Sequence, residues 1–176
     1  EPDNPGTMVL PSMYGIDTSA DPIITGIAGK KDFTVITVEK NGMNSELGFG
    51  RKILACIEKY SVPFEHMPSS IDTLSVVLED SKLRGNLDDI VEDIKRVSAP
   101  DSIEVVGNMA LIATVGRGMR RSVGCSGKLF GALAKANINI RMIDQGSDEM
   151  NIIIGVENDD FERALIAIHD EFLLDA

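Results

Sequence analysis

The sequence has 176 residues, a formal net charge of −11 and two cysteines. An acidic surface repels nucleic-acid phosphates, and two cysteines are too few for a disulfide scaffold, so we set nucleic-acid binding aside and expect reduced thiols in the cytoplasm. No run of about 18 consecutive apolar residues is present, so we expect no membrane span. The cysteines form no metal-binding motif, and we expect neither a metal nor a cofactor.

A first set of strand and helix patterns covers residues 23–106. Runs rich in β-branched residues predict strands, and apolar residues at helical spacing predict helices. The predicted strands are 23–28, 33–39, 64–67, 73–78 and 103–106; the predicted helices are 49–60 and 87–97; a polar turn fills 79–86. From residue 33 onward the order is βαββαβ, which is the ferredoxin-like unit.

A second set of patterns follows in the same order but lacks its last strand. The predicted strands are 110–115, 140–143 and 151–156, and the predicted helices are 125–136 and 159–172. A four-stranded unit needs one more strand beside its first, and the unassigned strand pattern is 23–28. We expect this N-terminal strand to complete the second unit; the alternative is that 23–28 is an irregular linker.

The two sets are copies of one another. Their residue numbers differ by 76 without a gap from 34 to 78, and by 71 further on, so the length difference falls in the polar turn. Identical pairs at the first offset include Ile36 and Ile112, Gly42 and Gly118, Met43 and Met119, Gly48 and Gly124, Lys52 and Lys128, and Lys59 and Lys135. The repeat predicts an α+β fold of two βαββαβ units.

The second copy carries the most specific motifs. They are GNMALIATVGRGM (107–119), GKLFGALAKANINIRMIDQGSDEMNIIIGV (127–156) and DDFERALIAIHDEF (159–172), with DNPGT (3–7) near the start. Together they resemble the C-terminal regulatory region of aspartate kinases, which contains two tandem ACT domains. The resemblance implies a first ACT domain at 31–107, a second formed by 23–30 plus 108–176, and a linker at 1–22 from a kinase domain that this sequence does not contain.

Two features depart from that family. The Lys-Phe-Gly-Gly phosphate-binding signature of the kinase domain is absent, so we expect no catalytic activity from this chain alone, and no catalytic residues. The loop before the helix predicted at 125–136 is filled by Arg120, Arg121, Ser122 and Val123, where the family tends to have proline or a small residue.

The loop before the first predicted helix has the chemistry of an amino-acid site. A ligand carboxylate is bound well by the free amides at a helix N-terminus, and glycines let the backbone approach it. A ligand ammonium needs carboxylates or carbonyls, which acids at the same edge can supply. The resemblance implies that the ligand lies between first ACT units of paired chains, facing these positions: Met43, Glu46, Gly48, Phe49, Gly50, Glu65, Ser69, Ser70 and Asp72.

The same residues have simpler interpretations. Gly48 and its counterparts can be turn glycines, and Met43 can be core filler. Glu65 and Asp72 can be ordinary surface acids in a chain with 28 of them. Cys125, at a predicted helix start, can be a buried inert thiol, and the two histidines are more typical of structural positions.

The resemblance therefore implies a regulatory, amino-acid-binding region that mediates feedback inhibition of aspartate kinase, the first step of aspartate-family amino-acid biosynthesis. The effector is a free amino acid, with lysine favoured because two acids suit its second ammonium, and threonine as the other candidate. The expected partners are a second copy of the chain and the kinase domain of the parent protein. The alternatives are a purely structural dimerisation module and a small ferredoxin-like enzyme; the absence of a convergent acid, base and nucleophile argues against the enzyme.

Overall fold

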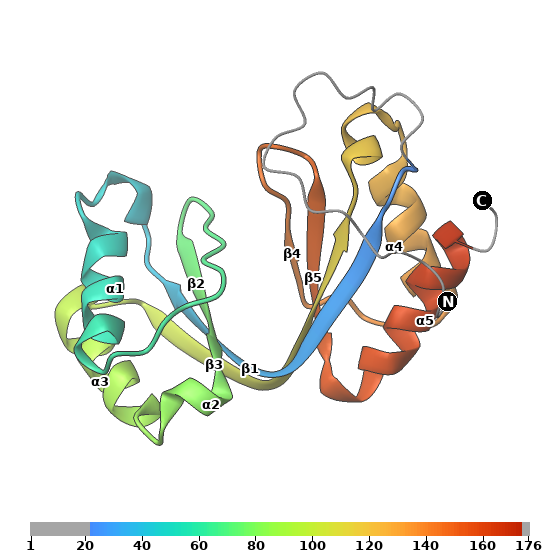
Figure 1. Ribbon diagram of the computed structural model, residues 1–176. Helices are drawn as coiled ribbons and strands as arrows, with labels where there is room; N and C mark the ends of the chain where they lie inside the picture. Colours follow the sequence, from blue (N-terminus) through green and yellow to red (C-terminus); the bar gives the residue numbers. More distant parts are fainter. Residues whose placement is uncertain (1–21, 174–176) are drawn as a thin grey trace, which may run out of the picture.

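The computed structural model describes residues 22–173 as a mixed α+β structure (Figure 1). Its strands are β1 (Gly26–Glu39), β2 (Thr73–Glu79), β3 (Ser102–Val115), β4 (Met142–Asp144) and β5 (Asn151–Glu157). Its α-helices are α1 (Phe49–Lys59), α2 (Asp80–Leu83), α3 (Leu87–Ser98), α4 (Cys125–Lys135) and α5 (Phe161–Leu173), and its 3-10 turns are η1 (Met43–Ser45), η2 (Arg117–Arg121) and η3 (Asn158–Asp160).

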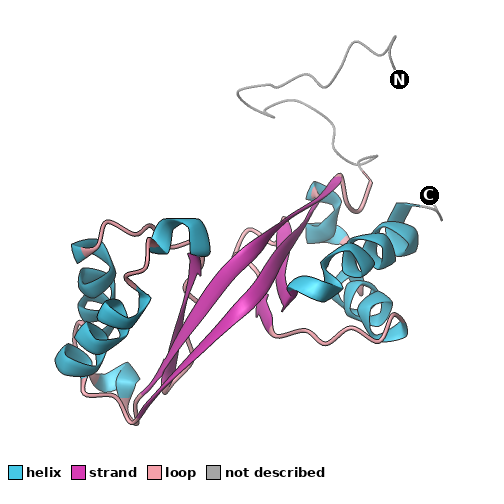
Figure 2. Cartoon of the chain, turned by 90° about the horizontal axis from the view of Figure 1, so that it is seen from below, coloured by secondary structure: helices cyan, strands magenta, loops and turns pink. Residues whose placement is uncertain are grey.

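One antiparallel sheet with the order β2-β1-β3-β5-β4 joins the two units. The start of β1, from Gly26 to Lys30, pairs with the end of β3, and the rest of β1 pairs with β2 and with the start of β3. Figure 2 shows the helices of the two units at opposite ends of these long strands. The fold is therefore two ferredoxin-like units, the second completed by the N-terminal strand, as predicted.

The prediction of separate strands on either side of residues 29–32 and 107–109 is wrong. Each pair of predicted strands forms one continuous 14-residue strand. Asp32 and Asn108 take positive φ angles of 69° and 60°, and the pairing register between β1 and β3 shifts between Lys30 and Phe33. Asp and Asn tolerate this conformation better than most residues, so the strands bend between the units without ending.

Two shorter segments also differ from the prediction. Residues 64–67 form no strand; they contribute a single bridge between His66 and Val77, and Ser69 makes another with Leu74. Pro68 has no amide hydrogen to donate between these bridges, which limits the ladder. The polar turn after β2 contains the short helix α2.

Each unit has its own buried core between its helices and the sheet. Ile53 in α1 and Leu129 in α4, which are equivalent in the repeat, both have no exposed surface. Met43 and Met119 are also equivalent and buried, so both are core side chains. None of the described helices is long and apolar enough to cross a membrane.

Polar contacts also join the units. The Nζ of Lys30 lies 2.7 Å from Glu79, and the Nδ1 of His66 lies 3.1 Å from a carboxylate oxygen of Asp144. Because each pair joins one residue of each unit, these contacts help to fix the position of one unit relative to the other.

Candidate functional site

The loop between β1 and α1 ends at a helix start that has no side-chain cap. Gly42 and Gly48 both have positive φ angles, 72° and 75°, which glycine adopts at little cost. Gly48 is the N-cap of α1, and the first turn of the helix carries no acidic residue. The helix dipole at this end therefore favours an anion from outside the helix.

The turn before β2 packs against this loop. The amide of Gly42 donates to a carboxylate oxygen of Asp72 at 2.8 Å, and the amide of Asn44 donates to the carbonyl of Ile71 at 3.2 Å. The Ser70 hydroxyl lies 2.6 Å from that of Thr73 in the same turn. The structure thus brings most of the predicted site residues to one edge: Met43, Glu46, Gly48, Phe49 and Gly50 from the loop, and Ser69, Ser70 and Asp72 from the turn.

Glu46 is already paired within the chain. Its two carboxylate oxygens lie 2.7 Å from Lys40 Nζ and 2.5 Å from Lys52 Nζ. These hydrogen bonds, first that from Lys40, lower the pKa of Glu46, so the group stays ionised. Sequence reasoning missed both lysines, although the identical pair Lys52 and Lys128 marked one of them.

Two predicted residues reach the site only with their backbone. The side chains of Met43 and Phe49 lie in the core of the first unit, with 7% and 3% of each residue exposed. Gly50 faces β2 closely enough that an added Cβ would lie 3.6 Å from a methyl of Leu74. The amides of Met43 and Phe49 already donate to the carbonyls of Lys40 and Glu46, so these residues shape the loop, and Gly50 allows close approach of the backbone.

Glu65 lies apart from the loop in a single chain. Its amide donates to the carbonyl of Val77, four residues along β2 from Thr73 and therefore about 13 Å from the turn by the rise of a strand. The side chain is exposed and makes no ion pair among the described residues. Within one chain, Glu65 and Asp72 do not converge.

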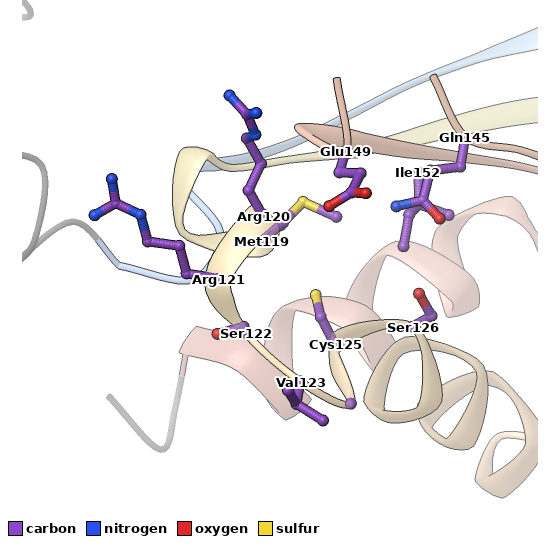
Figure 3. A pocket seen from close by; sticks show the side chains of 11 residues that line it. Met119, Arg120, Arg121, Ser122, Val123, Cys125, Ser126, Gln145, Glu149 and Ile152 are labelled. Carbon is purple, nitrogen blue, oxygen red and sulfur yellow. The ribbon is translucent and has the colours of Figure 1, made fainter. Parts of the chain in front are cut away.

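The equivalent loop of the second unit opens into a cavity of about 270 Å³ (Figure 3). Its lining residues are Met119, Arg120, Arg121, Ser122, Val123, Gly124, Cys125, Ser126, Gln145, Glu149 and Ile152. Residues 119–126 are the counterparts of 43–50 in the repeat. The repeat offset could have located this site, because it carries the predicted loop directly onto the cavity.

The cavity has a polar interior. Figure 3 shows the thiol of Cys125, the amide of Gln145 and the carboxylate of Glu149 around one space, with Arg120 and Arg121 pointing away from it. Burial raises the pKa of the Cys125 thiol, which keeps it neutral and unreactive. The described residues contain no group of three or more His, Cys, Asp and Glu placed to hold a metal ion.

Comparison with known proteins points to one family. Residues 112–172 match the ACT domain model. The chain is 34% identical over 157 residues to aspartokinase 3 of Bacillus subtilis, a match that covers 89% of this chain and 34% of the relative. Crystallised aspartate kinase from Clostridium acetobutylicum is 57% identical with a TM-score of 0.83, over 89% of this chain and 37% of that one.

An isolated domain matches over nearly its whole length. A chain described as a proposed C-terminal regulatory domain of aspartate kinase from Porphyromonas gingivalis is 28% identical with a TM-score of 0.66, over 84% of this chain and 96% of that one. By contrast, this chain spans about a third of the length of the Bacillus and Clostridium proteins.

Two ferredoxin-like units with a glycine-bounded loop before the first helix, together with the domain match, define a regulatory region of the ACT class. The chain belongs with the ACT-containing regulatory regions of aspartokinases.

Proposed function

We propose that this region regulates the aspartate kinase activity of its parent protein by binding a free amino acid. The kinase activity is assigned to the parent because the chain is similar to about one third of full-length aspartokinases. In this proposal the region contributes no catalytic group, and the regulated reaction is the first step of aspartate-family amino-acid biosynthesis, in the cytoplasm.

The domain division that we propose follows the pairing of the N-terminal strand segment with the second unit. The first ACT domain comprises residues 31–107, and the second combines residues 23–30 with 108–176, after a linker at 1–22. The pairing of Gly26–Lys30 with β3 supports this division, and residues 1–21 and 174–176 lie outside the described part of the chain. The second domain cannot complete its sheet without the segment that precedes the first.

The effector is proposed to bind at the loop before α1. The observation that carries this proposal is the packing of the 69–72 turn, through Asp72 and Gly42, against the loop that ends at the uncapped start of α1. The helix amides would receive the ligand carboxylate. We favour lysine because Glu65 and Asp72 offer negative charge for its second ammonium, and threonine is the other candidate.

A second chain would complete the site. Glu65 is about 13 Å from the turn by strand geometry, so one chain does not surround a ligand with both acids. We therefore propose a homodimer through the ACT units, in which Glu65 and the loop of different chains approach each other. Ligand binding would favour one dimer arrangement, and the coupling to the kinase would be worth about 1–3 kcal/mol, as in other allosteric proteins.

A purely structural dimerisation module is the second candidate. Glu46 is satisfied by two lysines, and one Asp72 oxygen already accepts the Gly42 amide. These contacts stabilise the loop without a ligand, which is what a structural module requires.

Calorimetric titration with L-lysine and then L-threonine, alongside mass measurement by light scattering, tests the proposal. We expect saturable lysine binding to a dimer, and at least a tenfold weaker affinity in Glu65→Ala with unchanged circular dichroism. Binding of threonine alone would keep the sensor and change its effector. A stable dimer that binds neither amino acid would favour the structural module.

A further inference from the structure

We propose that the chain binds a second copy of itself through two helix faces: the groove between α1 and α3 of one copy receives the outer face of α5 of the other. The groove belongs to the first unit and the α5 face to the second, so each copy carries one face of each kind (Figure 1). Neither face contains a residue of the proposed effector site, so the proposal goes beyond that site and does not depend on ligand binding there.

The groove between α1 and α3 is basic, although the chain as a whole is acidic. It has a volume of about 280 Å³ and is lined by Arg51, Lys52, Ala55, Cys56, Lys59, Asp93, Arg96 and Val97. Its lining thus contains four cationic side chains and one carboxylate, whereas the whole chain has 28 Asp and Glu residues against 17 Lys and Arg. Such a groove favours an acidic partner, and another copy of this chain is acidic.

Part of the positive charge in the groove has no carboxylate of its own. The single carboxylate, that of Asp93, is shared by Lys59 and Arg96. Lys52 is paired with an acid outside the groove, and Arg51 makes no ion pair among the described residues. The groove therefore keeps an excess of positive charge that acids of a partner can balance.

The exposed side of α1 presents its cations at a regular spacing. Arg51, Ala55 and Lys59 are four residues apart and all exposed, and residues at this spacing lie above one another on one side of a helix. We call these three residues the basic row. Ala55 leaves room between the two cations, and Val97 of α3, which is 40% exposed, lines the same groove. An apolar side chain of a partner helix fits at the middle of this row.

The exposed side of α5 has the complementary pattern. Glu162, Ile166 and Asp170 are also four residues apart and all exposed, and we call them the acidic row. Ile166 is 60% exposed, so a large apolar side chain stands between two acids. An apolar hollow of about 330 Å³ lies beside it, lined by Ile27, Leu165, Ile166, His169 and Asp170.

The acids of this row stay accessible to a partner. Glu162 lies 2.7 Å from Lys31, and Asp170 lies 3.2 Å from His169, within the same chain. The two carboxylate side chains are nevertheless 65% and 52% exposed. Exposed pairs of this kind contribute little to stability, so contact with further cations costs little.

The two rows match in charge, spacing and shape. When the acidic row lies along the basic row, Ile166 meets Ala55, each acid meets a cation, and Val97 faces the apolar hollow beside Ile166. The charges match in either helix direction, because each row has the same charge at both ends. The contact joins the first unit of one copy to the second unit of the next, which links copies head to tail.

The second unit does not offer an equivalent groove. At the repeat offset of 76, the counterparts of Arg51 and Ala55 in α4 are Gly127 and Gly131, so one cation of the row is missing. The acidic row is therefore expected to select the first unit. Because the contact is small and its charges are exposed, we expect the association to be weak and to weaken further with salt.

Sedimentation equilibrium of the chain at low salt, over a range of protein concentrations, tests the proposal. Ala55→Glu places an acid opposite the acidic row, and Ile166→Lys places a cation opposite the basic row. Both positions are exposed, so both variants should fold, which circular dichroism checks. Ser147→Glu and Ser147→Lys are the controls, since they make the same charge changes at an exposed position outside both faces.

We expect the average mass of the wild type to rise with concentration, and each single variant to weaken this association about tenfold because like charges then oppose each other. The Ser147 variants should behave as the wild type. An equal mixture of Ala55→Glu and Ile166→Lys should associate again, because the first keeps an intact α5 face and the second an intact groove. The proposal is overturned if the mass of the wild type rises no further than that of the single variants, or if the mixture associates no more than either variant alone.

Discussion

The loops before α1 and α4 occupy equivalent places in the repeat, but different side chains surround their helix ends. In the first unit, Glu46 binds two lysines beside the helix start. Its counterpart in the second unit is Ser122, which is too short to make such a bridge, and the counterpart of the buried Phe49 is Cys125. The same backbone arrangement thus carries a loop held by ion pairs in the first unit and a loop beside a cavity in the second.

The turn opposite each loop repeats the contrast. Asp72 accepts the amide of Gly42 across the two segments at 2.8 Å. Its counterpart Asp148 accepts the amide of Met150 in its own turn at 3.3 Å, and so does not tie the turn to the loop. The two units therefore differ in this side-chain contact, although a backbone hydrogen bond joins turn and loop in both, from Asn44 to Ile71 and from Gly116 to Met150.

The largest expected effect tests whether the two cores are equivalent. Ile53→Ala and Leu129→Ala each remove a fully buried side chain from matching helix positions. Each should lower the free energy of unfolding by about 2–5 kcal/mol in urea denaturation. A loss below about 1 kcal/mol at only one position would show that the side chains around it relax to fill the space, and that the two cores are not equivalent.

A smaller loss of unfolding free energy is expected where residues 22–24 cross the second unit. A Cβ added to Gly116 would lie 2.1 Å from the Ile23 carbonyl oxygen, whereas the equivalent residue of the first unit is Lys40. Gly116→Ala should therefore cost about 1–3 kcal/mol by thermal or urea unfolding.

Gly131→Ala is the control for that substitution. Gly131 lies within α4, and an added Cβ would meet nothing within 4 Å. The change should leave stability unaltered or raise it by up to about 1 kcal/mol, because alanine favours helix. If Gly116→Ala is equally harmless, the close crossing of residues 22–24 is not a feature of the folded protein.

The cross-loop contact in the first unit should have a moderate effect. Asp72→Ala removes the acceptor of the Gly42 amide and should cost about 1 kcal/mol of unfolding free energy. Asp148→Ala, its counterpart, should stay within about 0.5 kcal/mol. Equal losses at both positions, measured by urea unfolding, would show that the contact between Asp72 and Gly42 does not distinguish the two loops.

The smallest expected effect depends on pH. Hydrogen bonds from Lys59, Arg96 and Tyr60 lower the pKa of Asp93 from 3.8 to about 2, and its side chain is 13% exposed. Because the folded pKa is the lower one, this stabilisation is present above pH 4 and is lost as the pH falls from about 4 to 2. The corresponding helix pair of the second unit is joined by a more exposed ion pair, Lys135 with Glu171.

The Asp93→Asn variant checks this assignment. Its melting temperature should be lower than that of the wild type at pH 7, and it should fall less steeply between pH 4 and pH 2. The Glu171→Gln variant should change neither the melting temperature at pH 7 nor its fall between pH 4 and pH 2, since solvent-exposed ion pairs contribute little to stability. If the melting temperatures of the wild type and of Asp93→Asn fall by the same amount between pH 4 and pH 2, the account is contradicted.

Periodicity and the internal repeat were sufficient to predict the helices, most strands and the completion of the second unit by the N-terminal strand. They could not show that β1 and β3 are continuous, because the bends depend on single residues, Asp32 and Asn108, whose positive φ has no signature in hydrophobic patterning. The absence of a strand at 64–67 also depends on a single residue, because Pro68 has no amide hydrogen to donate to β2.

The site was less predictable than the fold. The loop and its glycines could be located from sequence, but the partners of Glu46 come from β1 and α1 together, and side-chain direction is set by packing. Arg120 and Arg121 were expected to fill the loop before α4, but they point away from its cavity. Glu149 faces that cavity from a turn with no recognisable motif.

A crystal structure of the chain grown with L-lysine tests the central proposal of an effector site in the first unit most directly. The account predicts lysine at the loop formed by residues 43–50, with its carboxylate at the start of α1 and an ammonium within hydrogen-bond distance of Asp72 or of Glu65 from a second chain. Lysine bound only in the cavity beside α4, or a dimer whose first-unit loops are buried against each other without ligand, would contradict it.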